Sequence, residues 1–382
     1  MENVIVKLKK FYRRNMNKAL KILDRKLFKL AFCFIILCIF VSFLQAKVKA
    51  VWVPIWDIAS PEKIDELVAD AKKNKINQIL LQVRYRGDAL YQPNREDKTY
   101  PNLEKKSYVL KDSEFDPLEY LIQRTEKTKI EVYAWITVFI ATPHDLGKLQ
   151  PDHIFFTHPE WITADFTGQK MPNDILEGAY LEPGIPQVQN YLFNIIMDIV
   201  INYDIDGIHL DYIRYPDMQF GYNEIARDKF KAEVQNQNAE SWKNWKEEQI
   251  NNFLKEISFE IKLTSPQTKI TAAVMPNPDI AKNRYSQNWI KWLKKGYVDA
   301  VYLMAYTQSD SFLAELLENA AEQRMNKKII VGLKAWSDNG KYSAAQINDK
   351  IKIVKKKRFA GVALFSYLGI KQNNYFKDLK IK

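Results

Sequence analysis

The chain of 382 residues has a formal net charge of +11, but residues 1–29 hold ten basic and two acidic side chains, so they account for +8 and the remainder for +3. A nearly balanced body lacks the basic face that nucleic-acid binding requires, so we expect no nucleic-acid partner. Both cysteines, Cys33 and Cys38, lie in one apolar stretch near the start, so the rest of the chain has no disulfide, cysteine–metal site or cysteine nucleophile.

The first predicted element is a leader for export. The basic residues 1–29 precede an unbroken apolar run of 15 residues, Leu30–Leu44. That length suits a signal peptide and falls short of the ~20 residues of a comfortable membrane span. A buried helix would rarely follow so basic a leader. We therefore expect residues 1–46 to be a signal peptide or a signal anchor, and the body to be exported to the periplasm or cell surface; whether the leader is cleaved stays open.

The body, residues 50–382, alternates strand-like runs with amphipathic helical patterns. The predicted strands are Ala50–Trp56, Gln78–Arg84, Ile130–Phe139, Gly207–Asp211, Lys269–Met275, Asp299–Tyr306, Lys328–Lys334 and Gly361–Phe365. Eight such βα units in series predict an α/β fold, a single (β/α)8 TIM barrel, with an open doubly wound sheet as the alternative. We expect this barrel to carry a long loop, 141–185, and a helical insertion near 222–264.

The strand Gly207–Asp211 has polar residues where a core would be apolar. With period two, Ile208 and Leu210 point to one side, and His209 and Asp211 to the other. Asp211 ends the strand, and in parallel α/β folds this end is where ligands bind and catalytic side chains collect. The alternative is that Asp211 is a capping residue and His209 a hydrogen-bonded core histidine.

Aromatic and charged residues recur at the predicted C-terminal ends of the other strands. Closing the barrel brings these ends together into one cup. Sugar rings stack on aromatic rings while their hydroxyls bind charged groups, so such a lining indicates a carbohydrate site rather than core packing. The predicted lining is Trp56, Arg84, Trp135, His209, Asp211, Tyr306, Lys334 and Phe365.

The loop 141–185 is far longer than the 2–6 residues usual for such connections, and loops of this length are commonly functional. Its histidines, His144, His153 and His158, do not have zinc spacing. We therefore expect neither a metal site nor a cofactor. Glu182 precedes a Pro-Gly pair that suggests a turn, and we predict that it binds substrate.

Four motifs in this order resemble the glycosyl-hydrolase-like family ten, a group of exported bacterial barrel proteins. They are Gln82-Val-Arg-Tyr-Arg-Gly-Asp-Ala-Leu-Tyr91, Ala134-Trp-Ile136, Leu181-Glu-Pro-Gly184 and Asp206-Gly-Ile-His-Leu-Asp211. The resemblance implies a (β/α)8 barrel and glycoside hydrolase activity, with bacterial glycans, including peptide-free peptidoglycan strands, as a substrate class. Many relatives have two adjacent aspartates where this chain has Asp211 and Tyr212, and Asn-Pro where it has Thr137 and Val138.

A fainter similarity links two strand ends to family eighteen chitinases. Those proteins end the fourth strand in Asp-x-Asp-x-Glu and carry Met-x-Tyr-Asp on the sixth. This chain has Ile213 in place of the acid glutamate and Thr307 in place of the last aspartate. The chitinase mechanism therefore does not carry over unaltered.

Glycosidic cleavage in most families uses two carboxyl groups, one protonated and one ionised. Asp211 is the candidate for the ionised member, with a nearby cation such as Arg84 holding its pKa low. Its catalytic partner is left open between Asp88 and Asp310, with Glu182 third.

The sequence thus predicts an exported glycoside hydrolase acting on a bacterial polysaccharide. A glycan-binding barrel without catalysis is the alternative, because Tyr212 and Ile213 stand where carboxylates are common. A deacetylase or esterase is disfavoured, since no serine nucleophile elbow or metal-spaced histidine pair is present. We expect a monomer whose partner is a polysaccharide or peptidoglycan glycan and which touches the membrane only through its N-terminal segment.

Overall fold

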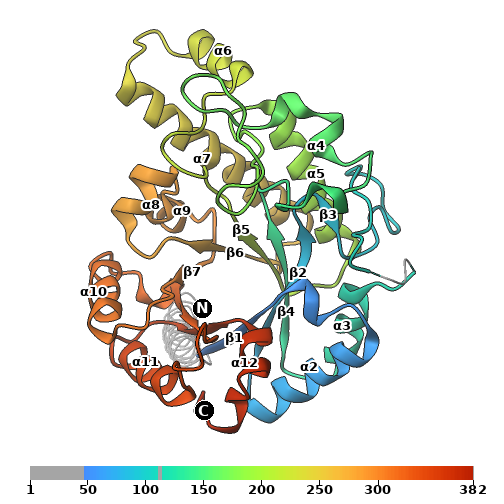
Figure 1. Cartoon of the computed structure of the whole chain (residues 1–382), viewed down its shortest axis with the longest axis vertical. Helices are drawn as coiled ribbons and strands as arrows, with labels where there is room; N and C mark the ends of the chain where they lie inside the picture. The colour runs from blue at the N-terminus through green and yellow to red at the C-terminus, as the bar shows by residue number, and fades with distance from the viewer. Residues whose placement is uncertain (1–46, 111–113, 382) are drawn as a thin grey trace, which may run out of the picture. The chain divides into compact units, whose positions relative to one another are not determined.

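Eight parallel strands close into a barrel in the computed structural model, which describes residues 47–110 and 114–381 (Figure 1). β1 pairs in parallel with β2 on one side and with β9 on the other. The predicted TIM barrel is confirmed, and the open sheet is excluded. The barrel strands are β1 (Val48–Val53), β2 (Gln78–Tyr85), β4 (Glu131–Thr137), β5 (Gly207–Asp211), β6 (Lys269–Val274), β7 (Ala300–Met304), β8 (Ile329–Lys334) and β9 (Gly361–Phe365), and the short β3 (Asp88–Ala89) pairs antiparallel with β2.

Helices cover the outside of the barrel, and capping residues define their starts. Asp116 accepts hydrogen bonds from two backbone N–H groups at the start of α3, and Ser343 forms a capping box with Gln346 at the start of α11. The α-helices are α2 (Pro61–Asn74), α3 (Pro117–Thr125), α4 (Ile154–Thr157), α5 (Pro186–Asn202), α6 (Glu224–Glu233), α7 (Ala239–Thr264), α8 (Pro278–Tyr285), α9 (Trp289–Lys295), α10 (Asp310–Ala321), α11 (Ala344–Lys356) and α12 (Tyr367–Gln372). The 3-10 turns are η1 (Ile55–Asp57), η2 (Leu146–Lys148), η3 (Pro159–Trp161), η4 (Asn326–Lys328) and η5 (Tyr375–Lys377).

Side-chain alternation divides each strand between two cores. In β1, Val51 and Val53 belong to the core between strands and helices, whereas Ala50 and Trp52 face into the barrel. The barrel interior is therefore packed rather than open, and only the C-terminal ends of the strands can offer a site. The inner cluster is Ala50, Trp52, Leu80, Tyr133, Trp135, Tyr302, Ile330 and Ala363.

The first strand ends three residues earlier than predicted. Pro54 has no N–H for the ladder, so β1 stops at Val53 and the chain turns into η1. Trp56 therefore sits on this turn with 45% of its surface exposed, and its ring packs edge-on against Tyr85 at 5.8 Å. It lies at the rim rather than on the barrel's inner face.

The second of the two helices between β5 and β6 is too long to be an ordinary barrel helix. α7 has 26 residues, about 39 Å at 1.5 Å per residue, whereas β5 has five residues and spans about 17 Å. It ends at Thr264, shortly before β6 begins at Lys269. The first half of α7, together with α6, therefore extends beyond the C-terminal ends of the strands (Figure 1).

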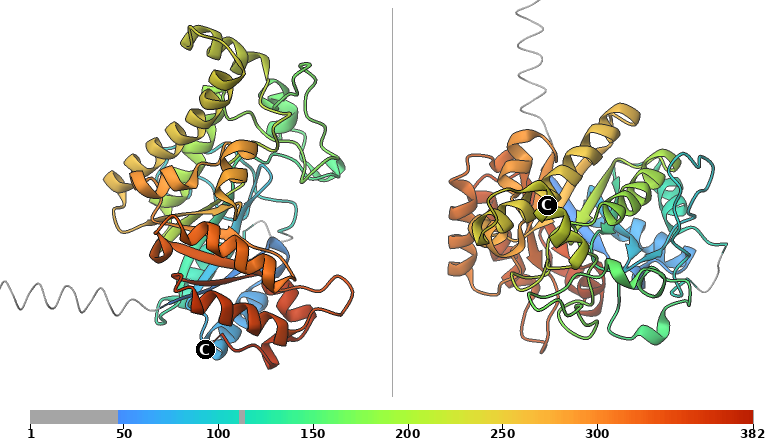
Figure 2. Two further views of the ribbon diagram at one scale, coloured as in Figure 1. Left: turned by 90° about the vertical axis from the view of Figure 1, so that its left-hand side faces the viewer. Right: turned by 90° about the horizontal axis from the view of Figure 1, so that it is seen from above.

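The connection 138–185, between β4 and α5, packs against this extension (Figure 2). The backbone N–H of Tyr222 donates to the carbonyl of Ala164 (3.0 Å), and the Asn223 amide donates to the carbonyl of Ile162 (2.8 Å). We call these parts together, residues 138–185 and residues 220–251, which contain α6 and the first half of α7, the wall. It stands beside the C-terminal ends of the barrel strands, for which we keep the name cup.

The predicted leader, residues 1–46, lies outside the described residues. Within residues 47–110 and 114–381, no helix has the length and apolar character to cross a membrane. Export and membrane attachment therefore stay predictions from the sequence.

Candidate active site

Asp211 is the last residue of β5, at the C-terminal end of the barrel's inner face. Its Oδ1 accepts a hydrogen bond from the backbone N–H of Tyr212 (2.8 Å), and its Oδ2 accepts one from Trp135 Nε1 (3.1 Å). The side chain is only 7% exposed, and burial raises its pKa to about 6, since these bonds and the charge of Arg214 offset only part of the lost hydration. The expected low pKa of Asp211 is therefore wrong, and the group can hold a proton near neutral pH.

Arg84 is not the cation that acts on the pKa of Asp211, contrary to the prediction. Its fully buried guanidinium pairs with Glu104 (2.7 Å between Nη2 and Oε1) and donates from Nη1 to the carbonyls of Thr137 and Val138. The reason is a register shift in the pairing of β2 with β4 between Gln82 and Arg84, which breaks the side-chain alternation. Arg84 holds β4 in place instead of lining the cup.

The second carboxylate near Asp211 is Glu177, which the sequence reasoning did not select. Its Oε1 accepts from Arg214 Nη2 (3.2 Å) and its Oε2 from the hydroxyl of Tyr180 (3.2 Å). Its negative charge raises the pKa values of Asp211 and Tyr212, so it lies within electrostatic reach of both. Because 38% of the Glu177 side chain remains exposed, the carboxylate is accessible from solvent.

Arg214 interacts with both carboxyl groups, with Glu177 through an ion pair and with Asp211 through its charge. Its guanidinium, buried at 6% exposure, donates to Glu177 and to the carbonyls of Tyr215 and Pro216 (3.3 Å each). It also lies 5.3 Å from the ring centre of Tyr212, one of three tyrosines around it. These contacts fix its position, so the ion pair with Glu177 is built into the site and its charge also acts on Asp211.

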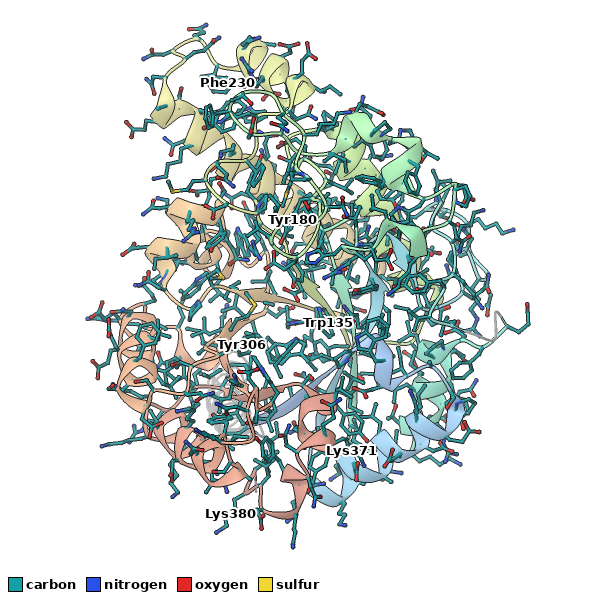
Figure 3. The ribbon with its side chains drawn as sticks, in the orientation of Figure 1. Trp135, Tyr180, Phe230, Tyr306, Lys371 and Lys380 are labelled. Carbon is teal, nitrogen blue, oxygen red and sulfur yellow. The ribbon has the colours of Figure 1, made fainter. Side chains whose placement is uncertain are left out.

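Aromatic rings line the cup next to Asp211. Phe365 lies 6.1 Å from Trp135 and 5.3 Å from Tyr306 between ring centres, and Trp336 lies 5.8 Å from Tyr306. Burial raises the pKa of Tyr306, as does the nearby charge of Asp211, which places this ring beside the carboxyl group. Figure 3 shows Trp135 and Tyr306 together in the middle of the barrel. We call Trp135, Tyr306, Trp336 and Phe365 the cup rings; three of them lie where the sequence predicted, and Trp336 follows β8 by two residues.

Lys334 ends β8 at the edge of the cup rings. Its ammonium lies 4.3 Å from the ring centre of Trp336 and donates to Asp338 (2.6 Å). Trp336 donates to the other oxygen of the same carboxylate (2.8 Å). Lys334 thus orients the Trp336 ring, and its positive charge is paired with the carboxylate of Asp338.

His209 lies one layer below, inside the packed barrel. It has no exposed surface, its Nε2 accepts from Trp52 Nε1 (3.0 Å), and its Nδ1 bonds the Thr271 hydroxyl (3.0 Å). Burial lowers its pKa to about 3, so the imidazole is neutral. The alternative of a hydrogen-bonded core histidine is the correct one, and His209 does not reach a substrate.

Asp88 lies outside the cup, in β3. It is 3% exposed, accepts a hydrogen bond from Ser107 (3.4 Å), and has its pKa raised to about 7 by burial and by the charge of Glu104. It lines a depression of about 300 Å³ with Glu104, His153 and other residues, and no cup ring is among them. Asp88 is therefore not positioned as the partner of Asp211.

The other two candidate acids are also placed elsewhere. Asp310 begins α10 and pairs with Lys350 of α11, so it points toward the neighbouring helix. Glu182 has no exposed surface; it accepts from the Thr163 hydroxyl (2.7 Å) and from the backbone N–H of Gly184 (3.3 Å). It holds the wall together and does not bind substrate.

The resulting site contains one buried carboxyl group that can carry a proton, one accessible carboxylate paired with an arginine, and an aromatic lining. No group of three metal-ligating side chains gathers among residues 47–110 and 114–381. A closed barrel with carboxyl groups and aromatic rings at the C-terminal ends of its strands is an arrangement that many glycoside hydrolases share.

The family follows from comparison of the whole body. The model of the family described as glycosyl hydrolase-like 10 matches residues 46–361, and the chain belongs to this family. The chain is 30% identical over 212 residues to the glycosyl hydrolase YngK of Bacillus subtilis (strain 168), covering 53% of this chain and 38% of that protein. It is 25% identical over 180 residues to the glycosyl hydrolase DigH of Escherichia coli (strain K12), covering 44% and 37%. The chain thus spans less than half the length of these relatives.

Solved structures share the fold. The glycoside hydrolase domain of PgaB (BpsB) from Bordetella bronchiseptica aligns with a TM-score of 0.68 at 14% identity, covering 87% of this chain and 97% of that domain. The alpha-L-fucosidase isoenzyme 2 from Paenibacillus thiaminolyticus aligns with a TM-score of 0.61 at 13% identity, covering 87% and 48%. The barrel is therefore one that glycoside hydrolases use.

Proposed function

We propose that the protein is an exported glycoside hydrolase that cleaves glycosidic bonds in a bacterial polysaccharide. The observation that carries this proposal is the presence of two carboxyl groups at this end of the barrel: Asp211, with its pKa of about 6, and the Arg214-bound Glu177, which lies within electrostatic reach of Asp211. Two carboxyl groups in different protonation states are what glycosidic cleavage requires.

The environments of Asp211 and Glu177 indicate a role for each. Asp211 takes the role of the protonated acid, not that of the ionised group expected from the sequence. Asp211 donates its proton to the oxygen of the leaving sugar as the C–O bond breaks. Glu177 faces the developing positive charge on the sugar and acts as nucleophile or as base for water. Arg214 holds Glu177 in place through their ion pair, and the partly exposed cup rings Tyr306, Trp336 and Phe365 hold the sugar by stacking.

For the substrate, we propose peptide-free peptidoglycan strands, the class that the family resemblance implies. The basic leader and apolar run of residues 1–46 support export of the body to the place where such strands occur. The protein would act there as a monomer, released or held by its N-terminal segment.

A second candidate is a glycan-binding barrel without catalysis. Tyr212 favours it, because this residue stands where many relatives have a second aspartate and its ring packs on Arg214. Binding would then use the same cup rings but form no product.

One assay separates the two candidates. Protein lacking residues 1–46 is incubated with intact and with peptide-free peptidoglycan strands, and new reducing ends are counted. We expect product from the peptide-free strands with the wild-type protein and none with Asp211→Asn. Binding of the strands by both proteins without product over long incubation would support the glycan-binding barrel.

A further inference from the structure

A second aromatic depression lies on the wall, away from the cup rings. It has a volume of about 450 Å³, and its lining comes from both parts of the wall: Phe166, Tyr222, Arg227, Phe230, Lys231, Gln237, Asn238, Ala239 and Trp242. Figure 3 shows Phe230 at the far end of the molecule from Trp135 and Tyr306, with Tyr180 between them in this view. Phe230, Trp242 and Trp245 are buried and form a small core between α6 and α7, whereas Phe166 is exposed at the depression.

Stacked rings form one side of the depression. Tyr222 stacks on Trp242 (5.4 Å between ring centres, 25° between planes), and Trp242 stacks on Trp245 (5.1 Å, 15°). Phe230 meets Trp242 edge-on at 4.7 Å. The rings are therefore locked in orientation and form a rigid side of the depression, which need not be ordered when a ligand binds.

Phe166 lines the same depression from the 138–185 segment, and 70% of its surface is exposed. The segment is held close, because the residue before it, Asp165, forms a β-bridge with Phe220. An exposed ring facing a fixed aromatic cluster is the arrangement that holds a flat sugar ring from two sides.

Polar groups of this depression are positive or neutral, and no carboxylate lines it. Lys231 pairs with Asp228 (2.7 Å), whereas the guanidinium of Arg227 has no ion-pair partner within the described part of the chain. The buried indole N–H of Trp242, a residue 8% exposed, likewise has no hydrogen-bond acceptor there. An oxygen-rich anionic ligand in the depression would pair with the cation of Arg227, whereas the buried indole N–H lies below the surface.

We propose that this wall depression is a second glycan-binding site, which takes a carboxylate-bearing sugar of a polysaccharide strand. The exposed ring of Phe166 stacks on the sugar beside the edge of the Tyr222–Trp242 stack, and Arg227 pairs with its carboxylate. Tyr222 follows Asp211 by 11 residues, so the two sites lie at most about 40 Å apart, and one long strand can occupy both. The inference rests on the proposed function only for the identity of the strand.

The test measures binding in the full-length Asp211→Asn protein, so that turnover does not interfere. Two probes share a backbone of N-acetylated hexosamines: peptide-free peptidoglycan strands, which carry carboxylates, and chitin oligosaccharides, which carry none. We expect Phe166→Ala to weaken binding of the strands about tenfold, the effect of one well-placed contact. Arg227→Ala should weaken binding of the strands by a similar factor and leave chitin binding unchanged.

Phe259→Ala is the matched control, because Phe259 is 68% exposed on the same helix α7 but lines a different depression. It should bind both probes as the parent does. Equal affinities of Phe166→Ala and the control would overturn the proposal. So would dimerisation of the parent that Phe166→Ala abolishes, because the depression would then be an interface between copies. Loss of strand binding in Phe166→Ala together with an inactive wild-type enzyme would leave this site standing and reject hydrolysis.

Discussion

Two clusters in this barrel are built from the same three groups: a buried aspartate with a raised pKa, a glutamate, and a buried arginine that pairs with the glutamate. They are the cup cluster, Asp211, Glu177 and Arg214, and the side cluster, Asp88, Glu104 and Arg84. The difference lies in the glutamates, since the Glu104 side chain is 1% exposed and that of Glu177 is 38% exposed. Glu104 also accepts a hydrogen bond from Tyr191 (2.6 Å), so its oxygens are occupied from within the protein.

The comparison teaches that burial and a raised pKa do not by themselves identify catalysis. Structural ion-pair networks shift pKa values as active sites do. The cup cluster differs because its glutamate is accessible from solvent and its aspartate lies beside two cup rings, Trp135 and Tyr306. We therefore assign chemistry to the cup cluster and stability to the side cluster, and the following changes can break that division.

The largest effect is expected from Asp211→Asn. The amide keeps the shape of the side chain and removes its acidic proton, so the rate of glycan hydrolysis should fall by about 10⁴-fold. Reducing-end release measures this, and the same preparation should unfold at the wild-type temperature or above it, because the amide removes the cost of ionising a buried carboxyl group. Asp88→Asn is the matched control from the side cluster and should keep its activity. Loss of activity in both variants would contradict the assignment of catalysis to the cup cluster alone.

Arg84→Met should act on stability. Removing the guanidinium leaves Glu104 charged and buried, which costs about 3–5 kcal/mol of the free energy of unfolding. Urea denaturation measures the loss, and the hydrolysis rate at low temperature should stay unchanged. Arg124→Met is the control, because the Arg124–Asp65 pair is half exposed and should contribute less than about 1 kcal/mol. If Arg84→Met and its control were equally stable, the side cluster would have no structural role.

The raised pKa of Asp88 sets a pH dependence of stability. Its ordinary pKa is 3.8 and its folded pKa is about 7, so between these values the folded state holds a proton that the unfolded state has released. The free energy of unfolding therefore falls as pH rises through this window, with Asp211 adding to the fall up to about pH 6. Asp88→Asn should flatten the fall between pH 4.5 and 7 by on the order of 2 kcal/mol. Urea denaturation at both pH values checks this, and an unchanged slope would contradict the raised pKa.

The smallest effect is expected from Trp336→Ala in the cup rings. The ring is partly exposed, so its removal should cost little stability but about tenfold in glycan affinity, seen as a higher KM at nearly unchanged kcat. Phe312→Ala, on the exposed face of α10, is a suitable control because it removes an exposed ring far from any role in the cup. Unchanged KM in Trp336→Ala would remove this ring from the substrate site.

Much of this architecture could be predicted from the sequence because strand periodicity and strand ends are local signals. The ranges of all eight barrel strands were close to those observed, and Asp211, Trp135 and Tyr306 lie together as period-two alternation indicated. The sequence placed His209 on the correct face of the strand but not at the correct depth. Alternation shows which side chains point into the barrel, but not which of them are buried in its packed interior.

The misplaced residues have identifiable causes. Arg84 follows a register shift in β2, which no periodicity argument detects, and Trp56 follows the proline that ends β1. Glu177 lies in an irregular segment, where neither period two nor helical spacing applies, and only the folded chain brings it to Arg214. The Gly178 after it was the one local hint, since its φ of +122° and its contact with the Thr142 carbonyl require glycine at this turn.

The central claim is that the cup cluster, and not the side cluster, performs hydrolysis. The most direct measurement compares reducing-end release from peptide-free peptidoglycan strands by Glu177→Gln and Glu104→Gln, prepared and assayed side by side at low temperature. We expect Glu177→Gln to lose about 10³-fold or more in rate while remaining folded, and Glu104→Gln to keep its rate although it unfolds at a lower urea concentration. Full activity in Glu177→Gln, with activity lost in a folded Glu104→Gln, would contradict the account.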